Sequence, residues 1–262
     1  MSPRIGTAGW SIPRGVADRF PASGSVLERY ARVFDSVEVN STFYRPHRAA
    51  TLERWVSAVP ANFRFSVKVP RTISHEAGLA DCDQLVRSFL DQIGAFGEAL
   101  GPILLQLPPS LAFNSRTAGR VCEQLAGDGQ RLLCCEPRHS SWFTPEVDSW
   151  LAERGIARVA ADPVRHPEAG EPGGWRGFAY WRLHGSPRIY FSSYPAEALA
   201  ALAARLSREP AREVWCVFDN TASSAAAANA LTVKAMIDEP LQTAAATPSR
   251  SIASSTLQTS AK

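Results

Sequence analysis

Side chains that could carry acid–base or covalent chemistry recur where apolar segments of this chain end. Lys68 ends "FRFSVK", Glu136 ends "RLLCCE" and His184 ends "AYWRLH". A lysine close to arginines can have a lowered pKa and act as a base or as a Schiff-base amine. A glutamate can then serve as base or nucleophile, and a histidine as the acid. We therefore predict that Lys68, Glu136 and His184 are the catalytic residues of an enzyme of hydrolase, lyase or isomerase type.

Other polar residues stand at equivalent positions of other apolar segments. In "VEVNSTFYRPH" (residues 37–47), Glu38 and Asn40 alternate with the valines. Unpaired charge is costly to bury, so a ring of such residues is expected to face water or a ligand. Each residue alone could equally be a structural ion-pair partner. The predicted ligand-binding residues are Trp10, Glu38, Asn40, Thr42, Tyr44, Arg45, Gln106, Arg138, Asp162, Arg182, Asp219 and Asn220.

Arginines and aromatic residues are interleaved after these segments, which favours an anionic or polyol ligand such as a sugar phosphate or a nucleotide. Two alternatives stay open. The same residue types are typical of a nucleic-acid-binding groove, and Glu136, Asp162, His184 and Asp219 could hold a divalent metal for phosphodiester cleavage. The sequence has no His-x-His and no His-Glu-x-x-His, so we predict no metal and no cofactor.

The elements that must position these residues alternate along the chain. Short apolar segments predict strands, and apolar residues at helical spacing predict helices between most of them. Alternating strands and helices imply parallel βαβ units, so we predict a single-domain α/β fold of the (β/α)8 TIM-barrel type, whose active site lies at the C-terminal mouth. The predicted strands are 4–10, 36–42, 63–69, 102–108, 131–137, 157–163, 179–185 and 213–220. The predicted helices are 26–34, 49–59, 83–100, 116–126, 145–154, 196–206 and 222–237.

Composition adds limits to this prediction. Segment 164–177 is rich in proline and glycine and predicts an irregular unit after strand six. We predict one domain over 1–238 and a disordered tail over 239–262, which has almost no large apolar residue. A net charge of +3 is too small to argue for nucleic acid by itself. Free cysteines and no apolar leader or membrane-spanning run predict a cytoplasmic protein without a membrane partner.

Several of these motifs together resemble a known family. "GTAGW", "VEVNSTFYRPH", "FRFSVKVPRTISHE", "LGPILLQLPPS", "EPRHSSWF" and "YWRLHGS" occur in order over residues 4–237. They are similar to the YecE-like family, the domain of unknown function numbered 72. The resemblance implies a TIM-barrel-like fold and supplies no reaction. Members often read Glu-Phe-Arg-His where this chain has a proline at position 137.

Overall fold

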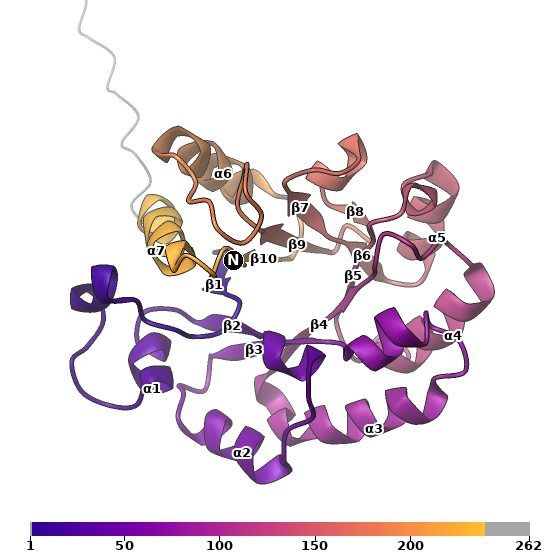
Figure 1. The fold of residues 1–262 in the computed structure, drawn as a ribbon, viewed down its shortest axis with the longest axis horizontal. Coiled ribbons are helices and arrows are strands. Elements are labelled where there is room, and N and C mark those ends of the chain that lie inside the picture. The colour runs from indigo at the N-terminus through magenta and orange to yellow at the C-terminus, as the bar shows by residue number, and fades with distance from the viewer. Residues whose placement is uncertain (1, 239–262) are drawn as a thin grey trace, which may run out of the picture.

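The computed structural model describes residues 2–238. It has parallel strands on the inside and helices on the outside (Figure 1). The predicted tail, 239–262, lies outside the described residues, so its predicted disorder stays a prediction.

The strands form two sheets. The first sheet is parallel throughout and has the order β1 (Arg4–Thr7), β10 (Glu213–Phe218), β9 (Phe178–Leu183), β7 (Ala160–Asp162). The second has the order β2 (Ser36–Val39), β3 (Arg64–Lys68), β4 (Leu100–Gln106), β5 (Leu133–Glu136), β6 (Ile156–Arg158), β8 (Gly173–Gly174). Its strands are parallel except β8, which runs antiparallel to β6. The predicted strands are confirmed at their centres and end earlier than predicted.

The hydrogen-bond ladders do not form one closed eight-stranded sheet. The predicted strand 157–163 is divided at Val159, because β6 pairs with β5 whereas β7 pairs with β9. At the other junction, β1 and β2 meet only through an isolated parallel bridge between Ala8 and Glu38. Figure 1 nevertheless shows the strands following one another around a common centre. The parallel α/β architecture is therefore observed, with two junctions where regular pairing stops.

Helices cover the outside of the strands, where the sequence predicts them. Ser25 caps α1 through a capping box with Glu28, and Thr144 caps α5, which has proline at its first position. The predicted helix 83–100 ends at Ile93 and continues as a short 3-10 segment. The helices are α1 (Val26–Ala31), α2 (Ala49–Ser57), α3 (Asp83–Ile93), α4 (Ser115–Ala126), α5 (Pro145–Glu153), α6 (Ala196–Arg208) and α7 (Ala225–Asp238).

The unit after β7 has no long helix, as the glycines and prolines of 164–177 predict. It contains the 3-10 turn η6 (Pro167–Gly170) and the two-residue strand β8, which the sequence did not indicate. A side chain at Gly173 would collide with the Arg158 guanidinium, and Gly174 has a positive φ of 61°. Glycine is therefore required for this close approach.

The space between the strands is filled by side chains. Its apolar part is a cluster of buried residues that includes Leu104, Phe178, Tyr180, Trp215 and Val217. Strand side chains alternate between two faces, so the same inward face continues from Tyr180 to Arg182 and from Val217 to Asp219. Toward the carboxyl ends of the strands the interior changes from apolar to charged, and this is where the predicted site residues lie.

Candidate active site at the strand ends

A buried charged cluster lies at the carboxyl ends of the inner strands, and we call it the central site. Its members come from β2, β3, β4, β5 and β9 and from the residues that directly follow β5, β9 and β10. All of them except the half-buried Arg138 are almost completely buried. The central site consists of Glu38, Lys68, Gln106, Glu136, Arg138, Arg182, His184 and Asp219.

Arg182 connects the carboxylates of the central site. Its Nε donates to Glu38 Oε2 at 2.9 Å, and its Nη2 donates to Glu38 Oε1 at 2.6 Å. Its Nη1 donates to Glu136 Oε2 at 3.0 Å, and Asp219 Oδ2 lies 3.1 Å from Nη2. A planar guanidinium matches a carboxylate in this two-bond geometry. Arg182 therefore holds three carboxylates from different strands in one cluster.

Below Arg182 the cluster continues into the interior through hydroxyl groups. Tyr180 Oη donates to Glu38 Oε2 at 2.9 Å, and Ser66 Oγ lies 3.0 Å from the same hydroxyl. Both of these side chains are completely buried. The hydroxyl groups satisfy the carboxylate where no water reaches it, as buried polar groups require. Glu38 is thus anchored from β9 as well as from its own strand.

Glu136 accepts hydrogen bonds from neighbouring side chains on both oxygens. Its Oε1 lies 2.9 Å from Gln106 Nε2, 3.2 Å from Arg138 Nη2 and 3.0 Å from His184 Nε2. The other imidazole nitrogen, Nδ1, lies 3.0 Å from Asp219 Oδ2. His184 therefore has a carboxylate at each ring nitrogen, an arrangement that suits the protonated imidazolium, which donates from both.

These contacts control the protonation states. Burial alone would raise the pKa of Glu136, but the charges of His184 and Arg182 hold it well below its ordinary value. Burial likewise opposes a charged imidazole, but Glu136 and the hydrogen bond to Asp219 raise the pKa of His184. The pKa of Asp219 is lowered in spite of its burial, chiefly by Arg182. Glu136 and Asp219 are thus ionised and His184 tends to be protonated, so that these three groups and Arg182 together balance two negative charges with two positive ones.

Lys68 differs from the other charged groups of the central site. Among residues 2–238 no carboxylate lies within ion-pair distance of its ammonium group, although the side chain is buried. Its Nζ instead lies 4.1 Å from the centroid of the Phe43 ring. Burial, together with the charge of Arg182, lowers the pKa of Lys68 to about 8, against the partial opposing effect of Glu38 and Glu136. About a tenth of the amine is therefore neutral at pH 7, far more than for an ordinary lysine.

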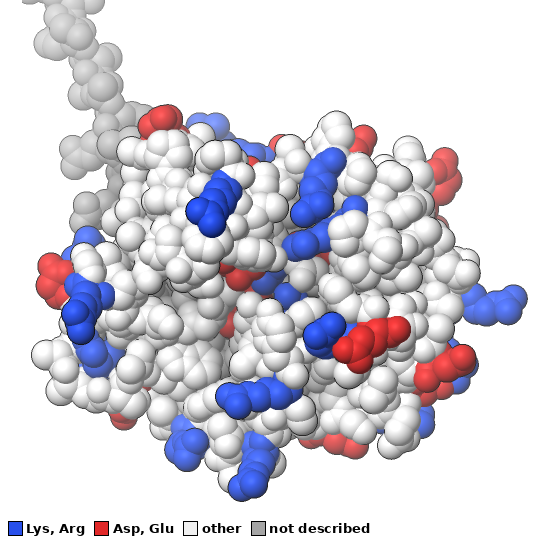
Figure 2. Space-filling model, viewed as in Figure 1, with Lys and Arg blue, Asp and Glu red and all other residues white. Residues whose placement is uncertain are grey.

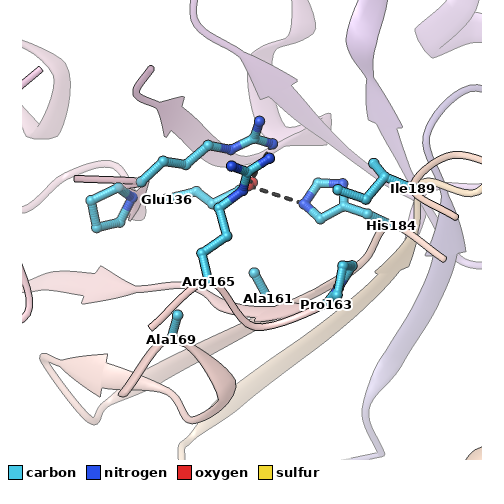
Figure 3. Close-up of a pocket in the computed structure, with 9 residues that line it drawn as sticks. Glu136, Ala161, Pro163, Arg165, Ala169, His184 and Ile189 are labelled. Carbon is cyan, nitrogen blue, oxygen red and sulfur yellow. Dashed lines mark hydrogen bonds and ion pairs between the residues drawn. The ribbon is translucent and has the colours of Figure 1, made fainter. Parts of the chain in front are cut away.

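A small cavity of about 20 Å³ opens next to His184 and Glu136. This volume suits about one water molecule. Arg138 and Arg165 also line it, and Figure 3 shows the Arg165 side chain extending toward Glu136. Two guanidinium groups thus border one small space beside the histidine. In Figure 2, acidic and basic atoms are visible at the bottom of a central hollow, and further Lys and Arg side chains lie on the surface around it.

The other predicted binding residues lie around the central site rather than in it. Thr42 Oγ1 donates to the backbone oxygen of Lys68 at 2.7 Å and so fixes the end of β3. Trp10 and Asn40 line a separate cavity near the β1–β2 junction. Tyr44 and Arg45 line a groove that borders α3.

Asp162 and Asn220 both have structural partners. Asp162 Oδ2 accepts a hydrogen bond of 2.7 Å from Tyr194 Oη. Asn220 Nδ2 donates to Ser192 O and to Asn229 Oδ1, at 2.9 and 2.8 Å. Their side-chain contacts secure the segment after β9 and the start of α7. Within the described part of the chain neither side chain forms a hydrogen bond to the central site, although the Asp162 backbone oxygen accepts one from His184 N at 2.8 Å.

The predicted site leaves out several residues that contact the central site, among them Tyr180, Ser66 and Tyr190. Tyr180 and Ser66 lie two positions before Arg182 and Lys68 on the same strand faces, so the period of two could have identified them. Tyr190 lies over His184, with ring centroids 5.8 Å apart, and its backbone has a positive φ of 69°. Its place follows from the path of the loop after β9, which no local pattern indicated.

Residues 2–238 contain neither a cluster of metal-ligating side chains nor a membrane-spanning helix. No group of three or more His, Cys, Asp or Glu side chains in this range could hold a metal ion. Within the same range, the helices are too short or too polar to cross a membrane. The absence of a metal requirement stays a prediction.

The amino-acid sequence of this chain matches a family model and several curated proteins. A family model described as "Protein of unknown function DUF72" matches residues 4–252. The UPF0759 protein YecE of Escherichia coli K12 is 34% identical over 164 residues, which cover 60% of this chain and 58% of that protein. The UPF0759 protein YunF of Bacillus subtilis is 28% identical over 180 residues, covering 64% and 60%. The matches thus span less than two thirds of these relatives' length.

Solved structures show the same fold over more of the chain. A DUF72 family protein of Thermotoga maritima has a TM-score of 0.73 and 28% identity, and the match covers 91% of this chain and all of that one. A DUF72 family protein of Enterococcus faecalis also has a TM-score of 0.73, at 22% identity, covering 90% and 95%. None of these descriptions names a reaction or a ligand.

Proposed function

The chain belongs to the DUF72 family, whose description states no activity. We propose from the central site that the protein is an enzyme. It uses the Lys68 amine as base or nucleophile on a small anionic or polyol ligand. The reaction class is hydrolysis, lysis or isomerisation. No cofactor is required in this proposal. His184 and Glu136 border the reacting group, and the arginines beside them bind its anionic part.

One observation carries the proposal. Lys68 is a buried cation without a carboxylate partner in the described structure, beside a cluster whose other charges are paired. Burying an unpaired charge opposes folding, and structural ion pairs are the usual way to avoid that cost. Its pKa of about 8 suits a group that must be neutral to react and protonated afterwards. A strongly perturbed amine beside a cluster of charged groups is typical of a functional site.

The surroundings favour an anionic ligand. Arg138 and Arg165 border the cavity beside His184, and two guanidinium groups can bind a phosphate or carboxylate through paired hydrogen bonds. His184, held protonated by Glu136 and Asp219, can donate a proton to a leaving or developing oxygen. Glu136 is engaged by its neighbours and is better suited to holding His184 than to attacking a ligand.

The fold supports this position for a reaction. We propose that the two sheets are a TIM-barrel-like arrangement interrupted at the β1–β2 and β6–β7 junctions. In that family of folds the active site lies at the carboxyl ends of the strands, where catalytic residues come from several strands. Lys68, Glu136 and His184 come from β3, the end of β5 and the residue after β9, as such a site requires.

The test combines turnover with amine reactivity. A panel of sugar phosphates and phosphorylated keto compounds would be incubated with the protein, and products would be followed by NMR. We expect turnover with a member of the panel, and a loss of at least about 1,000-fold in Lys68→Met. Lys234→Met is the matched control, because Lys234 lies on the outer helix α7 and pairs with Asp238 at 2.9 Å.

Competitive labelling gives a readout that does not need the substrate. Lysines would be acylated with trace reagent at several pH values and quantified by mass spectrometry. We expect half-maximal labelling of Lys68 near pH 8. Labelling of Lys68 that follows an unperturbed lysine, together with no turnover across the panel, would overturn the proposal.

A further inference from the structure

A groove beside the central site is built for a ligand of its own. It has a volume of about 260 Å³ and is lined by the segments that follow β2 and β3 and by the helix α3. We call it the Tyr44 groove. It is lined by residues 42–46, residues 70–72 and the side chains of Leu85, Ser88, Phe89 and Gln92. Its volume is just below the usual range of small-molecule sites.

The walls of the groove expose apolar surface. Tyr44 is 69% exposed and Leu85 is 43% exposed, and both are among the most exposed large apolar residues of the described chain. Phe43 packs edge-on against Tyr44, with ring centroids 5.0 Å apart. Exposed apolar side chains gathered around a concave surface indicate a binding site, because scattered ones would need no explanation. Flat aromatic walls favour a planar ring by stacking.

The charges of the groove select for an anion. Its lining contains Arg45 and Arg71 and no carboxylate. Arg45 forms no ion pair within residues 2–238, whereas Arg71 pairs with Glu76 at 3.1 Å on the surface. Gln92 Nε2 is buried in the groove wall and has no hydrogen-bond partner among the described residues. A buried donor without an acceptor is costly, so the Gln92 amide is an unsatisfied polar group in this wall.

The groove shares a wall with the reactive amine. Phe43 lines the groove, and the Nζ of Lys68 lies against the same ring at 4.1 Å from its centroid. Thr42, also in the lining, holds the backbone of Lys68 through its hydroxyl group. A molecule that stacks in the groove is therefore next to the central site. Binding there does not require any chemistry by Lys68.

We propose that the Tyr44 groove binds a planar ring that carries an anionic group, the chemistry of a nucleoside monophosphate. The ring stacks on Tyr44 and meets Phe43 edge-on, and Arg45 binds the anion. This goes beyond the proposed function, because it assigns a second recognition surface and a ligand class. It also stands if the Lys68 proposal fails.

The test measures binding of AMP, adenosine and inorganic phosphate by calorimetry. We expect AMP to bind, with adenosine and phosphate each at least about tenfold weaker, because both the ring and the anion contribute. Ser88→Trp fills the groove from the exposed face of α3 and should weaken AMP at least tenfold. Arg87→Gln, one position earlier on the same helix and outside the groove, is the matched control and should leave affinity unchanged.

A second variant is needed, because weaker binding by Ser88→Trp alone would not distinguish a filled groove from a folding defect. Tyr44→Ala removes an exposed ring and should also weaken AMP at least tenfold. No AMP binding at millimolar concentration, or full affinity in Tyr44→Ala, would overturn the proposal. Tight binding of oligo-dT that rises with strand length, without AMP binding, would also overturn it and indicate a nucleic-acid surface.

Discussion

At the scale of single residues, the central site separates two kinds of buried charge. Arg182, Glu136 and His184 hold one another through short hydrogen bonds, so their charges are compensated. Lys68 lies beside them without such a partner in the described structure, and its pKa is lowered to about 8. The first kind fixes geometry. The second opposes stability, which is the relation expected of a functional group.

The lowered pKa of Lys68 should make the free energy of unfolding depend on pH. The native pKa of Lys68 is about 8 and its ordinary value is 10.5. Between these values the unfolded chain binds a proton that the native protein lacks, so this group makes stability rise with pH across that window. We expect Lys68→Met to be more stable than wild type at pH 7, by up to roughly 3 kcal/mol. The difference should shrink as pH rises from 8 toward 10.5.

Urea unfolding of both proteins between pH 7 and pH 10 would measure this. Lys234→Met is the control, since its side chain is partly exposed and should give a difference that changes little with pH. A difference between wild type and Lys68→Met that stays flat across the window would show that Lys68 has an ordinary pKa in the native protein.

The charge of Glu136 should stabilise the native protein at neutral pH, whereas the charge of Lys68 should destabilise it. Glu136 is buried and accepts from Gln106, Arg138, Arg182 and His184. Its lowered pKa stabilises the native state above its ordinary value of 4.5, and this contribution is lost as pH falls. At pH 7 we therefore expect Glu136→Gln to cost roughly 3 kcal/mol or more, because buried cations lose their partner.

Two measurements check the Glu136 variant. Urea melts should show the loss, whereas Glu98→Gln, an exposed control, should stay within about 0.5 kcal/mol. NMR titration should show a lower pKa for His184, since the Glu136 charge is the largest influence that raises it. A cost below about 1 kcal/mol would instead favour Glu136 as a free functional base.

At the scale of elements, the junction between β1 and β2 depends on one glycine. A side chain at Gly6 would meet the Ser36 backbone oxygen at 2.5 Å, which no real contact allows. The neighbouring link is the isolated bridge between Ala8 and Glu38, with Gly9 N donating to Glu38 O at 2.8 Å. Close approach at Gly6 thus helps to hold the strand that carries Glu38 against the first sheet.

We expect Gly6→Ala to separate these strands and to destabilise the protein by about 2–4 kcal/mol, because backbone atoms must move. Gly94→Ala is the matched control, since nothing lies within 4 Å of its added carbon and its φ is −54°. Thermal melts of the two variants compare them. Equal melting temperatures would mean that the junction tolerates a methyl group, contrary to this account.

At the scale of the whole molecule, the arrangement of strands explains why the central site is assembled from distant residues. Glu38 and Arg182 are 144 positions apart and form a two-bond ion pair. The site draws on both sheets, with Glu38, Lys68 and Glu136 from one and Arg182 from the other. Solved family structures with TM-scores of 0.73 share this architecture. The arrangement of strands that brings these residues together is thus shared with the solved family structures.

The sequence by itself determined the alternation of strands and helices and the location of the polar strand ends. The period of two in "VEVN" and "FRFSVK" and the helical spacing of apolar residues are local signals, and each element forms close to where they predict it. Helix starts at Val26 and Pro145 follow from Ser25 and Thr144 for the same reason. These features depend on neighbours within a few residues, so the sequence contains the information.

Only the tertiary structure decided which charges are paired. The sequence left open which of the polar residues are structural ion-pair partners. The structure pairs Glu38 and Glu136 with Arg182 and leaves Lys68 without a carboxylate partner among the described residues. It likewise divided the strand at Val159 and moved Tyr44 and Arg45 from the central site into a groove of their own. The physical reason is that pairing and closure depend on distances between residues far apart in the chain, and no local pattern encodes those distances.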